Sequence, residues 1–296
     1  SFAQVYKGSW RGTEVAVKVL TGAQADEIQS FSEEFFLHSN LHHPNIVQIL
    51  GVLSRPQVDV EGMKTADLML VTEFLQRGAL STVLRDRHMP ADVRIGMCCD
   101  AARGMVYLHG HTPTILHRDL KTSNLLVDDR YRVKIADFGL SRIKDEGTMT
   151  ACGTPKYAAP EVLNHTKYGK PADVWSFGVC LWECWSLQAP YKNIAPLQVA
   201  VRVASSGHFL EFPSDTPPEV RHLSESCLHF QPSKRPDFPT VLDELTKLHY
   251  AARAKRMRED EGDDDEGSVG PTSPRSIPNT KWGSLVEQDY MHTPQA

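Results

Sequence analysis

Acidic, basic and amide side chains lie close together in the segment His-Arg-Asp-Leu-Lys-Thr-Ser-Asn at residues 117–124. A further acidic residue, Asp137, opens the tripeptide Asp-Phe-Gly. Oxygen atoms of carboxylates and amides are the ligands that Mg²⁺ prefers, and a carboxylate can also accept a proton from a hydroxyl group. Taken singly, each of these residues is also typical of a turn. Whether these residues bind a metal ion, accept a proton or only form a turn therefore has to be judged from the segments around them.

Two more motifs stand in a fixed order with these segments. Val-Ala-Val-Lys at residues 15–18 lies upstream, and Ala-Pro-Glu at residues 159–161 lies downstream. The four motifs together resemble the protein kinase family, and the resemblance extends from Ser1 to about Tyr250. It implies an α+β, bilobal fold with a small β-rich N-lobe, truncated at its first strand, and a larger helical C-lobe. It also implies ATP and Mg²⁺ as cofactors.

The resemblance implies a role in phosphoryl transfer for each polar residue of these motifs. Asp119 would accept or orient the proton of the substrate hydroxyl group, and Lys121 would reach the γ-phosphate. Asn124 and Asp137 would hold magnesium. Lys18 would contact the α- and β-phosphates, and its place in an apolar run indicates a buried, paired charge.

A lysine in that position needs a carboxylate partner, and the expected helix over residues 25–41 offers Glu33 and Glu34. In the family this glutamate lies ten residues before the proline of a His-Pro-Asn motif, here Pro44. We therefore predict that Glu34 pairs with Lys18. Glu33 is the alternative, and otherwise it is a solvated helix carboxylate.

The resemblance also predicts the pocket for ATP. Ser1 to Val5 resembles the second half of a glycine-rich loop in which Ala3 replaces the third glycine, so we expect slower loop closure. Thr72 would be the gatekeeper at the start of the hinge. The residues implied in ATP binding are Ala3, Val5, Ala16, Lys18, Thr72, Glu73, Leu75, Leu126 and Asp137.

Substrate class is indicated by Lys121 and by Gly-Thr-Pro at residues 153–155, which resemble serine/threonine kinases. The segments at residues 30–31, 43–47, 71–74 and 157–161 resemble the tyrosine-kinase-like group of these kinases. The predicted function is transfer of the ATP γ-phosphate to Ser/Thr hydroxyl groups of protein substrates in signalling. A pseudokinase or nucleotide-binding scaffold is the alternative. Ala3 and His38 keep this alternative open, because His38 stands where the family packs an apolar side chain. His38 itself is either a tolerated core histidine or a pH-sensitive switch.

Regulation and support follow from the same resemblance. Arg118 could clamp a phosphate on the activation loop, with Thr150 as the predicted phosphorylation site and Thr148 as the second choice. Glu161 and Arg235 resemble the ion pair that holds the second lobe together. Asp173 resembles the anchor of the catalytic loop.

The elements that must position these residues can be read from hydrophobic periodicity. We expect an N-lobe over residues 1–75, a C-lobe over residues 76–250 and a disordered charged tail over residues 251–296. The expected elements are a β-hairpin over 1–20, a helix over 25–41, strands over 46–52 and 68–74, and helices over 93–109 and 171–187.

Composition restricts the class of protein and its partners. A net charge of −5 argues against binding to nucleic acid, and the longest apolar stretch, residues 174–187, is too short to span a membrane. Six cysteines without a Cys-x-x-Cys pair indicate reduced thiols and a cytoplasmic location. The chain has neither an initiator Met nor a signal peptide, so membrane attachment through a segment upstream stays open.

Overall fold

The computed structural model describes residues 4–23, 28–29, 31–32, 35, 38–58, 64–86, 88–137, 142–143, 154–166 and 168–262. The chain divides into two compact units, residues 1–256 and residues 257–296. The boundary predicted between the lobes at residue 75 stays a prediction.

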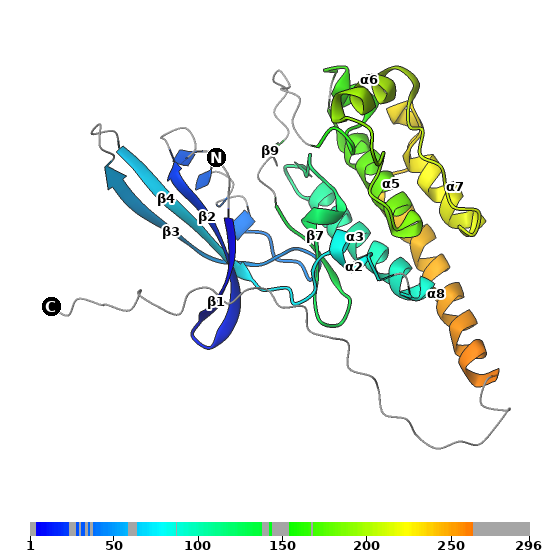
Figure 1. The fold of residues 1–296 in the computed structure, drawn as a ribbon, viewed down its shortest axis with the longest axis horizontal. Helices are drawn as coiled ribbons and strands as arrows, with labels where there is room; N and C mark the ends of the chain where they lie inside the picture. Colours follow the sequence, from blue (N-terminus) through cyan, green and yellow to red (C-terminus); the bar gives the residue numbers. More distant parts are fainter. Residues whose placement is uncertain are drawn as a thin grey trace. The chain divides into compact units, whose positions relative to one another are not determined.

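An antiparallel sheet forms the N-terminal part of the first unit (Figure 1). Its first two strands form the predicted hairpin, in which Arg11 and Gly12 turn with φ of 51° and 83°, as a tight hairpin turn requires. In the order in which they pair, the strands are β1 (Gln4–Trp10), β2 (Thr13–Ala23), β4 (Lys64–Glu73) and β3 (Ile49–Val58).

The register of this sheet gathers predicted site residues on one face. Val5 is paired with Lys18, and Ala16 is paired with Thr72. Directly opposed residues of antiparallel strands share a face, and residues two apart on one strand do so as well. These four side chains therefore line the same side of the sheet.

Helices dominate the rest of the first unit (Figure 1). Helix α5 (Lys170–Ser186) is buried almost all round, as its continuous apolar sequence predicts. The core packs it against α3 and against the first residue of α8, Phe238, whose ring lies 5.4 Å from that of Phe177. The other helices are α2 (Leu80–Val83), α3 (Ala91–Gly110), α4 (Pro160–Leu163), α6 (Pro196–Ser206), α7 (Pro218–Cys227) and α8 (Phe238–Gly262).

Short strands between the helices carry the loops of the motifs. Residues 117–124 run from β6 (Ile115–Leu116) to β7 (Leu125–Val127) and end in a 3-10 turn, Thr122–Asn124. Asp137 follows β8 (Val133–Ile135). The remaining short strands are β5 (Gly78–Ala79) and β9 (Arg142–Ile143).

Helix α8 corrects the predicted start of the tail. The helix continues beyond Tyr250 to Gly262, so residues 251–262 are helical where disorder was predicted. Ala, Arg, Lys, Met and Glu in this stretch favour a helix, and Arg256 finds a partner in Asp92 at 3.0 Å. The rest of the predicted tail, residues 263–296, lies outside the described residues.

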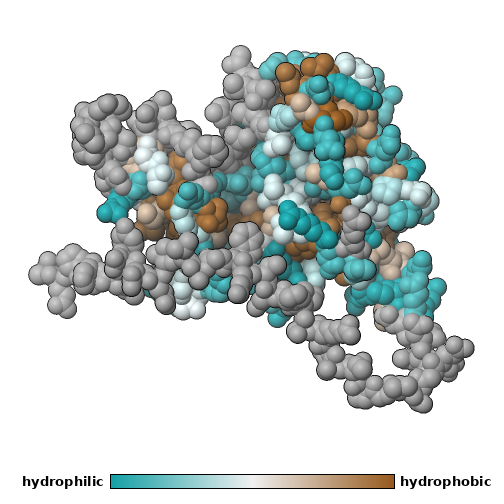
Figure 2. All heavy atoms as spheres, viewed as in Figure 1, coloured by the Kyte–Doolittle hydropathy of each residue, from teal (hydrophilic) through white to brown (hydrophobic). Residues whose placement is uncertain are grey.

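The visible face of the molecule is mostly hydrophilic over the helices, and hydrophobic residues gather near α6 (Figure 2). On that helix Leu197 and Val201 are exposed. In the described part of the chain, no helix is both long enough and apolar enough to cross a membrane. The cysteines of the same part, Cys98, Cys99, Cys180, Cys184 and Cys227, are buried and free.

Candidate active site

The loop that carries Asp119 is fastened to the N-terminus of α5 by Asp173. The backbone N–H groups of His117 and Arg118 donate to its two carboxylate oxygens at 3.0 and 2.9 Å. His109 Nε2 and the Tyr168 hydroxyl group donate as well, both at 2.9 Å. Burial acts to raise the pKa of Asp173, but the hydrogen bond from His109 and the neighbouring charges hold this pKa below its usual value. An ionised, fully buried carboxylate therefore holds the loop.

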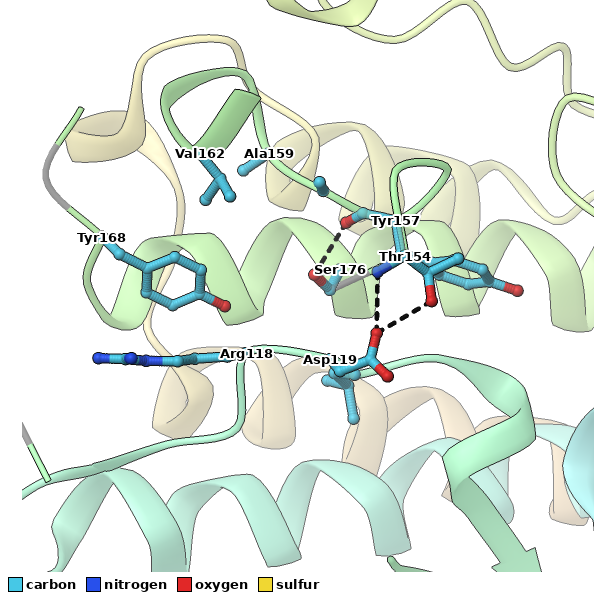
Figure 3. Close-up of a pocket in the computed structure, with 10 residues that line it drawn as sticks. Arg118, Asp119, Thr154, Tyr157, Ala159, Val162, Tyr168 and Ser176 are labelled. Carbon is cyan, nitrogen blue, oxygen red and sulfur yellow. Dashed lines mark hydrogen bonds between the residues drawn. The ribbon is translucent and has the colours of Figure 1, made fainter. Parts of the chain in front are cut away.

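Asp119 is held from several sides. Thr154 donates to Asp119 Oδ1 from its backbone N and from its hydroxyl group, both at 3.0 Å (Figure 3). Lys121 Nζ donates to Asp119 Oδ2 at 2.5 Å and to Thr154 Oγ1 at 2.9 Å. Asn124 Nδ2 lies 3.2 Å from Asp119 Oδ2. The carboxylate is therefore fixed in direction before any substrate arrives.

Asn124 and Asp137 are brought together by the backbone. Ala136 N donates to Asn124 O at 2.8 Å, which places the residue before Asp137 beside the loop. The amide nitrogen of Asn124 also donates to Asp119 O at 2.9 Å. The amide oxygen Oδ1 therefore points away from Asp119 O and can serve as a metal ligand. An amide oxygen and a carboxylate are a donor set that fits Mg²⁺ completed by phosphate oxygens.

Lys18 on β2 forms an ion pair with Asp137. The prediction of a paired charge at Lys18 is met, but that of a buried charge is wrong, because the side chains of this pair are 33% and 46% exposed. The pair is therefore accessible and can rearrange. The predicted partner of Lys18, Glu34, lies outside the described residues, as do Ala3, Thr148 and Thr150. Their roles stay predictions.

The predicted adenine residues divide into two groups. Val5, Ala16 and Thr72 share a face of the sheet, and Val5 is exposed there. Leu75, in contrast, is buried, so only its backbone can face a ligand. The side chain of Glu73 is also occupied, because Lys134 Nζ donates to both of its oxygens at 2.7 and 2.6 Å.

The predicted ion pair of the second lobe forms. Arg235 donates to Glu161 through two nitrogens at 2.7 and 2.8 Å. A guanidinium group can make two such parallel bonds, which fix distance and direction together. The end of the Ala-Pro-Glu segment is thereby fixed to the segment just before α8.

The comparisons with known proteins agree with this geometry. A family model described as protein tyrosine and serine/threonine kinase matches residues 1–245. The chain belongs to this protein kinase family.

Its relatives bear related names. The probable serine/threonine-protein kinase drkA of Dictyostelium discoideum is 43% identical over 253 residues, which cover 84% of this chain and 38% of that protein. The serine/threonine-protein kinase CTR1 of Arabidopsis thaliana is 39% identical over 269 residues, which cover 88% of this chain and 32% of that protein. The chain thus spans about a third of the length of these relatives. The predicted α+β fold, with a β-sheet region followed by a helical region, and the predicted protein kinase family are confirmed.

The kinase domain contains a buried network that the motifs did not reveal. Glu183, in the middle of α5, accepts hydrogen bonds from the Tyr157 hydroxyl group at 2.6 Å and from Thr122 Oγ1 at 2.7 Å. Burial raises the pKa of Glu183, and the two hydrogen bonds oppose this. The network joins the catalytic loop to the segment before Ala-Pro-Glu. Its sequence signal is a lone glutamate in an otherwise apolar helix.

His38 is buried near Lys18, His117 and Asp137, with 3% exposure. Burial lowers its pKa to about 3, and the nearby His117 and Lys18 act in the same direction, whereas Asp137 opposes them. The side chain is therefore neutral near physiological pH. This favours a core histidine over a pH-sensitive switch.

Proposed function

We propose that this domain transfers the γ-phosphate of ATP to serine and threonine hydroxyl groups of protein substrates. The observation that carries the proposal is the fixed carboxylate of Asp119, held by Thr154 and Lys121, with Asn124 and Asp137 beside it. Phosphoryl transfer needs positioning and charge neutralisation more than covalent chemistry by the protein.

Asp119 is the residue that orients the acceptor hydroxyl group and takes its proton as the new bond to phosphorus forms. Its Oδ1 already accepts two hydrogen bonds from Thr154, which define the direction of the carboxylate. The hydroxyl group of an entering substrate has to share the carboxylate with the present hydrogen-bond donors or displace one of them. Lys121 is the donor that would leave, since its side chain is 22% exposed and can turn toward the transferred phosphate.

Lys18 and Asp137 are the charged pair on the nucleotide side. Lys18 would bind phosphate oxygens of ATP, and its present ion pair with Asp137 would then give way to that contact. Asn124 and Asp137 would hold Mg²⁺, which neutralises phosphate charge when bound. Val5, Ala16 and Leu126 would enclose the adenine ring, and the hinge backbone from Glu73 to Leu75 would hydrogen-bond to its edge.

The preference for serine and threonine is supported by Thr154, whose hydroxyl group bridges Asp119 and Lys121. This bridge holds Thr154 of the Gly-Thr-Pro segment, a segment that resembles that of serine/threonine kinases, close to the carboxylate. Arg118 would bind a phosphate on Thr150 in the activated enzyme, and its Nε is buried without a hydrogen-bond partner among the described residues. A cytoplasmic location is supported by the free, buried cysteines.

A kinase assay with labelled ATP and phosphoamino-acid analysis tests the proposal. We expect label on serine or threonine, and a rate lowered by about 10² to 10⁴ in Asp119→Asn. Asp215→Asn is the control, because Asp215 is an exposed aspartate in a turn of the same lobe. Label on tyrosine, or an unchanged rate in Asp119→Asn, would refute the proposal. A thermal shift with ATP and no transfer in the unaltered protein would instead support the nucleotide-binding scaffold.

A further inference from the structure

A group of basic side chains surrounds Tyr191, next to the residues that hold Asp119. We infer that this group, defined by Lys156, Lys192 and Arg202, selects protein substrates with an anionic residue close to the acceptor serine or threonine. The inference rests on the proposed function and adds a substrate class to it.

Lys156 places positive charge beside the acceptor position. Residues 154–157 form a turn closed by Tyr157 N donating to Thr154 O at 2.8 Å, and Thr154 itself touches Asp119 (Figure 3). Lys156 lies in this turn and is half-buried. One residue, Pro155, separates it from Thr154, so its charge lies within the span of a few substrate residues.

The turn is joined to the loop between α5 and α6. Lys156 Nζ donates to Tyr191 O at 3.1 Å. Tyr191 and Asn193 have φ of 49° and 65°, a left-handed conformation that costs energy in residues other than glycine. A loop held in this conformation is fixed by its surroundings, so the adjacent Lys192 is presented from a rigid position. Lys192 is exposed.

Arg202 of α6 completes the group. Its guanidinium carbon lies 3.8 Å from the ring centroid of Phe209, and the ring of Phe209 lies 4.5 Å from that of Tyr191. Stacking on Phe209 holds the charged end of Arg202 toward Tyr191 without neutralising it. Burial raises the pKa of Tyr191, and the positive charge of Arg202 opposes this.

The three positive charges, those of Lys156, Lys192 and Arg202, have no ion-pair partner among the residues that the structure describes. Glu183, the acidic residue that contacts Tyr157, is buried and bonded to Tyr157 and Thr122. The protein as a whole has a net charge of −5, so a positive group at the acceptor site is a local feature and not a property of the whole surface.

An extended peptide bound with its hydroxyl group at Asp119 advances about 3.3 Å per residue. Aspartate, glutamate or a phosphorylated residue within about four positions of the acceptor would therefore come within reach of Lys156 and its neighbours. Charge complementarity at a partly exposed surface gives modest affinity and strong selection between substrates.

A peptide series tests this. A neutral peptide with one serine is compared with versions that carry Asp, Glu or phosphoserine at each position from about −4 to +4, which also separates carboxylate from phosphate recognition. We expect kcat/KM about tenfold higher for at least one anionic position, and a ratio that falls toward one at high salt.

Charge variants assign the effect to this group. We expect Lys156→Gln and Lys192→Gln each to lower the ratio of anionic to neutral kcat/KM, and Lys192→Arg to keep it. Lys247→Gln on α8 is the matched control, because it removes an exposed lysine charge elsewhere and leaves the ratio unchanged.

The outcomes distinguish this inference from the proposed function. Transfer to the neutral peptide without any anionic preference would overturn the inference and leave the proposed function standing. A preference that survives both glutamine variants would overturn the assignment to these residues. If no peptide is phosphorylated, the proposed function fails, and the inference fails with it.

Discussion

Thr154 donates two hydrogen bonds to the same oxygen of Asp119, one from its backbone and one from its hydroxyl group, both 3.0 Å long. The same hydroxyl group accepts a hydrogen bond from Lys121 at 2.9 Å. One side chain thus connects the proposed proton acceptor, Asp119, with the cation that would meet the phosphate. This connection makes Thr154 a positioning residue.

Replacing Thr154 with Val removes the hydroxyl group and keeps the shape of the side chain. We expect kcat to fall by about 10- to 100-fold, the effect of losing a hydrogen bond to a charged group, with KM for ATP unchanged. Steady-state kinetics measure both values. Thr154→Ser is the control and should retain most of the activity, whereas equal activity of the Val variant would contradict this role.

The ion pair of Arg235 and Glu161 predicts a large stability effect. Their side chains are 0% and 10% exposed, so Arg235→Met leaves a nearly buried carboxylate without its partner. We expect the free energy of unfolding to fall by about 3–5 kcal/mol in urea titration. Arg235→Lys should recover only part of this, because lysine cannot make two parallel hydrogen bonds.

A surface pair provides the control for that experiment. Lys247→Met removes an exposed ion pair with Asp243 on α8 and should leave the urea midpoint unchanged. If Arg235→Met were as stable as Lys247→Met, the buried pair would not be what holds the lobe together.

The sequence predicted the residue types of the site better than their partners. Asp119, Asn124 and Asp137 could be recognised from short motifs, and α5 from an uninterrupted apolar run. The bond between Lys134 and Glu73 could not, because it joins residues 61 positions apart and many surface lysines resemble Lys134. Which charges meet depends on tertiary placement, which local patterns do not contain.

The end of α8 shows the same limit. A run of charged residues after Tyr250 predicted disorder, because it contains too few apolar side chains to offset the entropy of ordering. Arg256 instead forms an ion pair with Asp92, which lies 164 positions earlier in the sequence, and Ala252 packs on the core. A long-range ion pair and an apolar contact accompany the continued helix, and neither is visible in the local sequence.

Gly104 predicts an effect of helix packing on stability. A methyl group on this residue of α3 would lie 2.6 Å from Ile135 Cδ1 and 2.8 Å from Asn45 O. Alanine favours a helix by about 1 kcal/mol over glycine, but these contacts force backbone to move, so we expect Gly104→Ala to destabilise by about 1–3 kcal/mol. Gly110→Ala in the same helix meets nothing within 4 Å and should show no loss. Thermal unfolding of the two variants decides between propensity and packing.

The lowered pKa of His38 predicts that the stability of the fold depends on pH and that the catalytic rate does not depend on the titration of His38. Its pKa is about 3 in the fold, near His117, Lys18 and Asp137, against 6.5 for an ordinary histidine. The unfolded chain therefore binds a proton that the folded chain excludes, and stability is lost as the pH falls below 6.5. Relative to His38→Leu, the unaltered protein should lose about 2 kcal/mol between pH 7 and pH 5 in urea titrations.

The catalytic readout separates this effect from a switch. Since His38 is neutral on both sides of pH 6.5 in the folded state, the pH–rate profiles of the unaltered protein and His38→Leu should have the same shape between about pH 6 and 8. A titration near pH 6.5 that is present in the unaltered protein and absent in His38→Leu would show that His38 takes up a proton during turnover. That result would require a conformation in which His38 leaves its buried position, because burial is the largest cause of its lowered pKa.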